Sequence, residues 1–356
     1  MRQFIGILLI SLLIGINQAQ AITLISDKFE SPWGMAFIDN NNLLISEKHG
    51  SIKQLNINTG KVIMLTQLPK VLGAGQGGLM DIQLAPDFEQ SQQIYVTYVT
   101  SHPQTKQPAT TLAKLQYTAN NGKQKPSLTQ LTPLYYSLAD SDKSHHFGSR
   151  LAFDKQHIYM TVGDRGHRTS AQDLNQDSGK ILRLNFDGSA AQNNPFFGET
   201  NKRAAVYSYG HRNQQGISFD KAGQLWTIEH GPRGGDELNL VHKGVNYGWP
   251  VISYGREYMS RLPVGTSHQA GMEQPVHYYV PSIAPSDLLI SQQNQFYISA
   301  LSGKQINKLT LDDNNQVINE QVLAKSLNQR IRSLAEDPDG NIYFVTDSGN
   351  LYKLTD

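Results

Sequence analysis

Short apolar stretches alternate with turns along most of the chain and form six similar units. Each unit has a short apolar stretch, a turn rich in Asp, Asn or Pro, a β-rich strand and a further alternating strand. The predicted strands of the first three units are Trp33–Phe37, Asn42–Ile45 and Ile52–Leu55; Leu79–Leu84, Ile94–Tyr98 and Leu112–Tyr117; and Arg150–Phe153, Ile158–Val162 and Ile181–Leu184. Those of the last three are Gly216–Phe219, Leu225–Ile228 and Glu237–Leu240; Asp287–Ile290, Phe296–Ile298 and Ile306–Leu309; and Ile331–Leu334, Ile342–Val345 and Leu351–Leu354.

Six such units predict an all-β fold, a six-bladed β-propeller with four-stranded blades. The long connections of the inner units can supply a fourth strand, whereas the sixth unit reaches Asp356 with three strands. The segment Ile22–Ser26 alternates and stands alone, so we expect it to complete the last blade and close the ring. Closure removes two exposed sheet edges. Two separate β-domains are the alternative, but no linker-like change of composition divides the chain.

The first residues have the pattern of a secretory signal peptide, which we predict for residues 1–21, with one propeller domain over residues 22–356. Arg2 provides the early positive charge, residues 4–16 are almost purely apolar, and Ala19 and Ala21 fit a cleavage site. The apolar run is shorter than the about 20 residues of a membrane span. An uncleaved anchor or a buried strand is the alternative. Cleavage after Ala21 would send the protein to the periplasm or out of the cell.

The composition argues against some functions and excludes others. The 356 residues include 31 Lys and Arg and 30 Asp and Glu, a balance that argues against a nucleic-acid-binding protein. There is no cysteine, so disulfides, thiolate metal sites and cysteine nucleophiles are excluded. We look for candidate functional residues in the long loops between strands, because long loops on a rigid scaffold are where binding and catalytic side chains are expected.

Two of these loops present neutral polar groups. His145 and His146 precede the third unit, and a histidine can act as a general base near neutral pH. A surface or core histidine pair is the alternative. The loop Gly73–Gly78 surrounds Gln76 with glycines that permit close approach of a ligand, or it is a plain loop.

Cationic side chains recur at the ends of the predicted blades. Arg212 and Asn213 follow a glycine, and a forked guanidinium there suits a planar carboxylate-bearing ligand. Lys304 lies in another loop, and Arg330 and Arg332 share one strand face because side chains repeat every two residues. These groups fit an anionic ligand, unless neighbouring acids pair with them.

The segment Glu229–Asn239 and the following Asn246–Pro250 combine glycine-rich backbone with carboxylates. Such oxygen atoms can bind a hard cation such as Ca²⁺. The spacing is not that of an EF-hand, and a polar turn is the alternative.

Together and in this order, these clusters resemble the glucose/sorbosone dehydrogenase family, soluble aldose dehydrogenases that use pyrroloquinoline quinone (PQQ) on a six-bladed propeller. The similarity covers nearly the whole chain after the predicted signal peptide. Its most specific segments are YSYGHRNQQGISFD and EHGPRGGDELNLVHKGVNYGWP, supported by GQGGLMDIQLAPDF, HHFGSRLAF, IYMTVGDRG, SGKILRLNFDGS and RIRSLAEDPDGNIYFVTD.

The resemblance implies a role for each candidate residue. His146 corresponds to the catalytic base, and Asp236 would lie near the substrate. The PQQ pocket, which must hold a tricarboxylate, carries over to Gln76, Arg212, Asn213, Tyr258, Lys304, Arg330 and Arg332. The catalytic Ca²⁺ would be held by the backbone carbonyls of Gly231 and Pro232, and a second, structural Ca²⁺ by Glu237 and the Tyr247 carbonyl.

The implied reaction is oxidation of an aldose at C1 to the lactone. His146 would remove the proton of the anomeric hydroxyl, Ca²⁺ would polarise the quinone, and an electron acceptor would complete the cycle. The segments GQGGL and HHFGS and the shorter loops depart from the glucose-specific members. We therefore expect a permissive aldose site and a monomer.

Two other functions stay open at this point. A Ca²⁺-dependent lactonase-like hydrolase would need several carboxylates converging on one metal. A non-catalytic propeller that binds a protein or a glycan would lack the histidine base or the cationic set.

Overall fold

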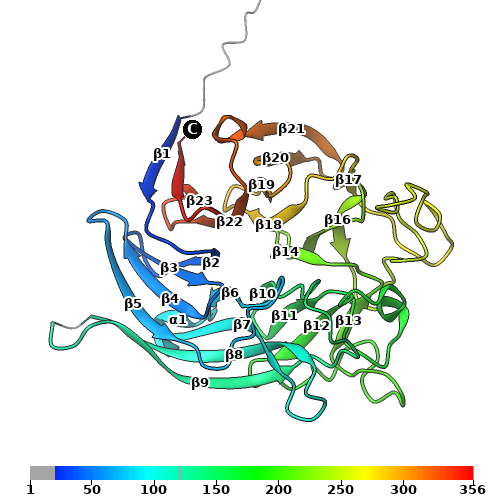
Figure 1. Cartoon of the computed structure of the whole chain (residues 1–356), viewed down its shortest axis with the longest axis horizontal. Coiled ribbons are helices and arrows are strands. Elements are labelled where there is room, and N and C mark those ends of the chain that lie inside the picture. The colour runs from blue at the N-terminus through cyan, green and yellow to red at the C-terminus, as the bar shows by residue number, and fades with distance from the viewer. Residues whose placement is uncertain (1–20, 121, 356) are drawn as a thin grey trace, which may run out of the picture.

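The computed structural model describes residues 21–120 and 122–355, so nearly all of the predicted signal peptide lies outside the described residues. Six four-stranded antiparallel sheets stand in a ring (Figure 1). The predicted all-β six-bladed propeller is therefore confirmed. The helices in the described part are α1 (Phe88–Ser91) and the 3₁₀ helices η1 (Arg168–Gln172) and η2 (Lys325–Leu327). In that part of the chain, no helix has the length and apolar character to cross a membrane.

The first five blades are each formed by four strands that follow one another in the chain. Blades one and two contain β2 (Pro32–Phe37), β3 (Asn42–Glu47), β4 (Ser51–Asn56) and β5 (Lys61–Gln67), then β6 (Leu79–Leu84), β7 (Gln93–Ser101), β8 (Pro108–Thr118) and β9 (Ser127–Tyr136). Blade three contains β10 (Leu151–Phe153), β11 (His157–Val162), β12 (Lys180–Asn185) and β13 (Val206–Tyr209). Blades four and five contain β14 (Gln214–Phe219), β15 (Leu225–Glu229), β16 (Asp236–Val241) and β17 (His277–Tyr279), then β18 (Pro285–Ile290), β19 (Phe296–Ala300), β20 (Gln305–Leu311) and β21 (Val317–Leu323).

The two ends of the chain meet in the sixth blade. It combines β22 (Ile331–Glu336), β23 (Ile342–Thr346) and β24 (Leu351–Thr355) with β1 (Ala21–Ser26) from the start of the chain. β1 runs antiparallel to β24, with Ile22 opposite Leu354, and the blue and red strands lie together in Figure 1. The prediction that Ile22–Ser26 closes the ring is confirmed.

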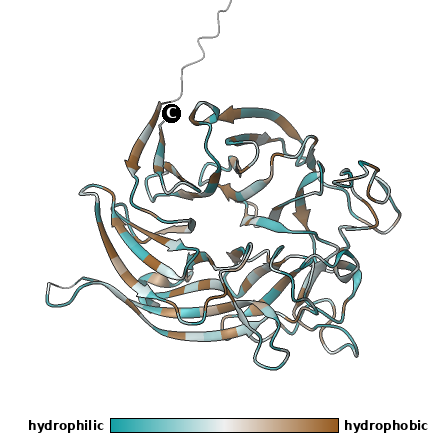
Figure 2. Ribbon diagram, viewed as in Figure 1, coloured by the Kyte–Doolittle hydropathy of each residue, from teal (hydrophilic) through white to brown (hydrophobic). Residues whose placement is uncertain are grey.

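The core lies between adjacent blades, because each inner strand buries both of its faces. On β3, Leu43 and Ile45 pack toward the sixth blade with Val345, whereas Leu44 packs toward the second blade with Val96. All five side chains are fully buried. This arrangement follows from the two-residue repeat of a strand, which sends neighbours to opposite faces. Figure 2 shows hydrophobic positions concentrated on the strands and hydrophilic positions on the loops.

A buried arginine occupies the axis where the innermost strands converge. Arg150, directly before β10, contacts the innermost strand of every other blade. Its guanidinium meets the Trp33 ring on β2, the Asp81 carboxylate on β6, the Gln215 carbonyl on β14, the Ser286 carbonyl on β18 and the Arg332 carbonyl on β22. One side chain therefore ties the ring together across its centre.

Candidate functional site

A cavity of about 340 Å³ opens at the end of the axis where the innermost strands begin. Four predicted cofactor-binding residues line it, namely Gln76, Asn213, Arg330 and Arg332. Other lining side chains come from several blades and include Trp33, Lys48, Phe147, His230, Leu301 and Asp347. The fold thus brings together residues from the glycine loop, blade four and blade six.

His146 directly precedes Phe147 and Gly148, which line this cavity, and is held by contacts on both its backbone and its ring. Its N–H donates to Oε1 of Gln76 at 2.8 Å, and its Nδ1 lies 2.7 Å from Oδ1 of Asp164. Asp164 also accepts hydrogen bonds from Nε1 of Trp249 and the N–H of Gly166, both at 2.8 Å. Because the carboxylate fixes Nδ1 of the imidazole, Nε2 is the nitrogen left for a substrate.

The surroundings of this pair keep the imidazole neutral. Burial lowers the pKa of His146, the charge of Arg212 lowers it further, and the hydrogen bond that Nδ1–H donates to Asp164 acts in the opposite direction. Burial alone would raise the pKa of Asp164, but the contact with His146 and the charge of Arg212 outweigh it, so that pKa is lowered. A neutral histidine beside an ionised carboxylate is the arrangement of a general base with an orienting partner.

His145, the other member of the pair, has a different environment. Its ring meets that of His146 edge-on at 4.7 Å between centroids, and its carbonyl accepts a hydrogen bond from Arg165. The ring lies against Gly166, where an added Cβ would be 2.4 Å from Nε2 of His145. The buried acid therefore orients the ring of His146 and not that of His145, and the role of His146 as the base stays a prediction.

Arg330 and Arg332 share one acid. Nε of Arg330 is 2.7 Å from Oδ2 of Asp347, and Nε of Arg332 is 2.8 Å from Oδ1. Burial opposes ionisation of Asp347, but the charges and hydrogen bonds of both arginines lower its pKa below the usual value. Two guanidinium groups and one carboxylate leave this wall of the cavity net positive.

Arg212 is buried beside the cavity and is incompletely paired. Its N–H donates to Oε2 of Glu229 at 2.6 Å and its Nη1 to the carbonyl of His230 at 3.1 Å. Its guanidinium lies 5.3 Å from the ring centroid of Trp249. Nε is buried and has no hydrogen-bond partner among the described residues. Buried donors are nearly always satisfied in folded proteins, so this atom indicates a missing acceptor.

Besides Arg212, two further predicted pocket residues are not among those that line the cavity. Nζ of Lys304 donates to Oδ1 of Asn328 at 2.9 Å, and Tyr258 is 56% exposed on the segment 254–263. Their predicted role in cofactor binding stays a prediction.

The predicted metal-binding loop rests on a buried carboxylate. No backbone N–H of residues 21–120 and 122–355 donates to the carbonyl of Gly231 or Pro232. Beneath them, Asp236 accepts the N–H of Gly231 at 2.9 Å, and its other oxygen accepts those of Ile283 at 2.8 Å and Ala284 at 3.0 Å. Asp236 is fully buried and lies under the loop, not on the cavity wall.

Glu237 and Tyr247 line a second, much smaller cavity together with Glu229. Burial and the neighbouring Glu229 raise the pKa of Glu237 well above its usual value. Oδ1 of Asn239 is also buried without a hydrogen-bond partner in the described part of the chain. No group of three or more His, Asp or Glu side chains that could hold a metal ion is present among the described residues. A cation bound here would therefore need backbone and amide oxygens as further ligands.

Sequence reasoning assigned no role to several residues of the site: Asp164, Asp347, His230 and Trp249. Burial and then the charge of Arg212 lower the pKa of His230 to about 3, so it presents a neutral ring to the cavity. All four lie inside segments quoted above for the family resemblance, so their positions in those segments could have marked them as candidates. Asp164 lies two residues after the end of β11, within the segment IYMTVGDRG.

Comparison with known proteins identifies the family. The sequence profile described as Glucose / Sorbosone dehydrogenase matches residues 29–353. Aldose sugar dehydrogenase YliI of Escherichia coli K12 is 34% identical over 351 residues, which cover 94% of this chain and 92% of that protein. The chain therefore belongs to the glucose/sorbosone dehydrogenase family and is an oxidoreductase.

Solved structures agree with this assignment. The apo form of the soluble aldose sugar dehydrogenase from Escherichia coli matches with a TM-score of 0.86 at 33% identity, covering 95% of this chain and 99% of that one. The PQQ-bound aldose sugar dehydrogenase from Streptomyces coelicolor matches with a TM-score of 0.79 at 25% identity, covering 94% and 98%.

Proposed function

We propose that this protein oxidises aldose sugars at C1 to lactones, with PQQ as the redox cofactor and Ca²⁺ as the metal. The observation that carries the proposal is the neutral His146, which pairs with Asp164 and donates its N–H to Gln76, a residue of the cavity that Arg330 and Arg332 also line. The similarity to proteins named as aldose sugar dehydrogenases, one of them PQQ-bound, supports the substrate class and the cofactor.

The residues present fit PQQ. Its carboxylates match the net positive wall formed by Arg330, Arg332 and Asp347, and a further acceptor would satisfy the unpaired Nε of Arg212. The amide of Asn213 lines the same cavity. When bound, PQQ supplies an ortho-quinone that accepts a hydride, and Ca²⁺ polarises the reacting carbonyl.

His146 performs the proton transfer in this proposal. Its Nε2 takes the proton of the anomeric hydroxyl, and the carboxylate of Asp164 stabilises the resulting imidazolium through Nδ1–H. The low pKa of His146 keeps the base neutral before each turnover at neutral pH.

The metal would rest on the loop that Asp236 supports. We propose that the free carbonyls of Gly231 and Pro232 bind the catalytic Ca²⁺, and that Asp236 positions this loop instead of touching the sugar. A second Ca²⁺ on Glu237 and the Tyr247 carbonyl would offset the buried charge beside Glu229.

The other two functions are less well supported. A lactonase-like hydrolase would centre on converging carboxylates, whereas the charged groups that line this cavity are mainly cationic. A binding propeller gives no reason for the oriented histidine. We also propose that the protein works as a monomer in the periplasm or outside the cell, after removal of residues 1–21.

Reconstitution tests the proposed function. Purified protein incubated with PQQ and Ca²⁺ should reduce an artificial dye with several aldoses and lose this activity when a chelator removes Ca²⁺. Protein that retains PQQ absorbance yet reduces no dye with any aldose would refute sugar oxidation. Protein that retains no PQQ would refute the cofactor.

A further inference from the structure

A large cavity between blades one and two has an unusual lining. Its volume is about 610 Å³, within the range of about 300–1,000 Å³ that is typical of pockets for small molecules. Five of its lining side chains are carboxamides, namely Asn42, Gln54, Asn56, Gln92 and Asn120. The cavity is called the amide cleft below.

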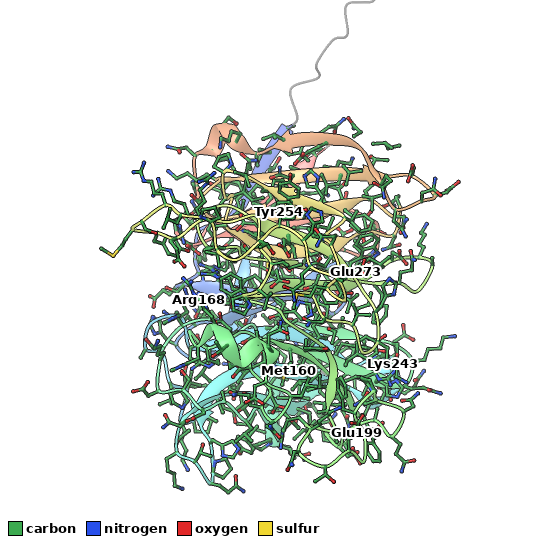
Figure 3. The ribbon with its side chains drawn as sticks, turned by 90° about the vertical axis from the view of Figure 1, so that its right-hand side faces the viewer. Met160, Arg168, Glu199, Lys243, Tyr254 and Glu273 are labelled. Carbon is green, nitrogen blue, oxygen red and sulfur yellow. The ribbon has the colours of Figure 1, made fainter. Side chains whose placement is uncertain are left out.

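The amide cleft and the candidate site lie at opposite ends of the strands. The candidate cavity opens where the innermost strands begin, whereas Ile38 and α1 of the amide cleft follow the ends of the innermost strands β2 and β6. Figure 3 shows the ring from the side, with Arg168 of η1 on one face and Lys243, after the far end of β16, on the other. The amide cleft is therefore separate from the cavity proposed for catalysis.

A chain of hydrogen-bonded side chains forms the floor of the amide cleft and joins the two blades. Oη of Tyr117 on β8 donates to Oε1 of Gln54 on β4 at 3.0 Å, and Nε2 of Gln54 donates to Oδ1 of Asn42 at 2.9 Å. Nδ2 of Asn42 donates in turn to Oδ2 of Asp39 at 2.9 Å. Tyr117 and Gln54 are only 6% and 8% exposed. Because the floor is already oriented, a ligand loses less entropy when it binds there.

Two carboxamides at the rim keep hydrogen-bonding capacity for a ligand. Nε2 of Gln92 donates to the carbonyls of Phe88 and Glu89, and its Oε1 accepts no hydrogen bond from the described residues. Oδ1 of Asn120 accepts the N–H of Gly122, and its Nδ2 has no hydrogen-bond partner in the described part of the chain. A carboxamide offers donors and an acceptor side by side, which matches the hydroxyl groups of a sugar.

The remaining wall combines carbon surface with few charges. Ile38 and Phe88 belong to the core cluster shared by blades one and two and also line the amide cleft. Besides Asp39, the cleft is lined by Lys61 and Glu89, which have opposite charges and form no ion pair within the described residues. A phosphate or a nucleic acid would need a cationic set instead, and most of the wall of a lipid pocket would be apolar.

The corresponding cleft between blades three and four shows that the fold itself does not require carboxamides. This second cleft has a volume of about 500 Å³, and its walls are mainly aromatic and aliphatic, with Phe153, Tyr207, Phe219 and Leu240 among them. Gln224 is the one carboxamide among the described residues that line it. The carboxamides of the amide cleft are therefore a property of this sequence and not of the propeller.

We propose that the amide cleft binds an uncharged saccharide of one or two sugar units, separately from the sugar that is oxidised. The oriented amides of the floor and the free amide groups of the rim hydrogen-bond adjacent hydroxyls, and the apolar wall contacts the C–H face of the sugar ring. No covalent bond forms or breaks in this cleft. The inference does not rest on the proposed function, because neither PQQ nor Ca²⁺ takes part in it.

Sugars that lack a free anomeric hydroxyl test the proposal, because they cannot be oxidised at C1. Ligand-observed NMR with the PQQ- and Ca²⁺-loaded protein should detect binding of at least one of sucrose, trehalose and methyl β-glucopyranoside. Gln54→Met nearly keeps the side-chain volume and removes both floor contacts of the amide. This change, and Asn120→Ala on the rim, should each weaken the binding about fivefold or more, the effect of losing one hydrogen bond.

Gln224→Met in the cleft between blades three and four is the matched control and should leave the binding unchanged. Thermal unfolding near the wild-type temperature checks that each variant is folded, and Asn120 is exposed, so its change spares the core. Binding of none of the three sugars, or undiminished binding by folded Gln54→Met and Asn120→Ala, would overturn the proposal. Protein without PQQ should bind the same sugars, so failure of the proposed function leaves this test intact.

Discussion

At the scale of single residues, the pairing of His146 with Asp164 decides which nitrogen can act on a substrate. The carboxylate occupies Nδ1 at 2.7 Å and is itself fixed by Trp249, so the ring cannot turn without breaking buried hydrogen bonds. Burial lowers the pKa of His146 and the charge of Arg212 lowers it further, which keeps the base neutral.

The pH dependence of turnover tests this role of Asp164. Burial holds the pKa of His146 below 6.5, so kcat/KM should rise with pH only through an acid limb below that value and then level off. Asp164 raises the pKa of His146, so Asp164→Asn should move the acid limb to lower pH and reduce the plateau by about 10²-fold or more.

The control for this experiment is a second His–Asp pair far from the cavity. Nδ1 of His157 lies 3.2 Å from Asp154 on blade three, and Asp154→Asn should leave both the limb and the plateau unchanged. An acid limb that stays in place in Asp164→Asn would contradict the positioning role.

The sequence could identify most site residues but not their partners. His146, Arg212 and Arg332 carry distinctive local motifs, whereas Asp347 becomes significant only when the fold places it between two arginines. An isolated aspartate after a strand looks like an ordinary turn residue. Its pairing is set by three-dimensional proximity, which strand periodicity does not encode.

At the scale of elements, the ring depends on strands whose sequence signals differ in strength. Three inner strands of every blade were predicted because their buried positions repeat clearly. The outermost strands, such as β21 (Val317–Leu323) and β5 (Lys61–Gln67), were expected only as unspecified parts of long connections. Most positions of β21 are exposed, so it has little hydrophobic pattern to detect. β1 (Ala21–Ser26) is also an outermost strand, but the sequence predicts it, because its apolar and polar residues alternate in a segment that belongs to none of the six units.

Closure by β1 should contribute measurably to stability. Ile25 is half-buried and packs against the cluster around Phe29 and Met35, so Ile25→Asp would place a carboxylate partly inside that cluster and should cost about 2–3 kcal/mol of unfolding free energy. Leu24, its neighbour, is 53% exposed, and Leu24→Asp should change stability by less than about 0.5 kcal/mol. Denaturant unfolding measures both. Equal effects of the two changes would argue against a closing role for this strand.

At the scale of the whole molecule, Arg150 links the inner strands at the axis. Its guanidinium lies 3.5 Å from Asp81 and 3.4 Å from Asp287, which are two carboxylates from different blades. Burial raises the pKa of Asp81 to about 6 even with this cation present. The ring therefore holds a buried charge cluster that only Arg150 balances among the described contacts.

Removing that charge should destabilise the ring in a pH-dependent manner. Arg150→Ala should cost about 3–5 kcal/mol at pH 8, because it leaves buried carboxylates without a counter-charge. The folded pKa of Asp81 is above its unfolded value, so its ionisation costs stability as pH rises through about 6. Loss of Arg150 raises this pKa further, so the variant should lose less at pH 5 than at pH 8.

Denaturant unfolding at the two pH values measures this difference. Arg183 provides the control, because it is buried but hydrogen-bonded to the neutral Asn193 and Asn194. Arg183→Ala should lose stability equally at both pH values. The same pH-independent loss in Arg150→Ala would show that packing, not charge, is what Arg150 provides.

The central claim is that His146 is the base of a quinone-dependent sugar oxidation. The most direct measurement is a single turnover of PQQ-loaded protein mixed with an aldose that carries deuterium at C1, followed through the cofactor absorbance. Wild type should show a rapid absorbance change that deuterium slows several-fold. His146→Ala should keep the oxidised cofactor spectrum and show no change on the same timescale. A full-rate change in His146→Ala, or no isotope effect in wild type with fast turnover, would contradict the claim.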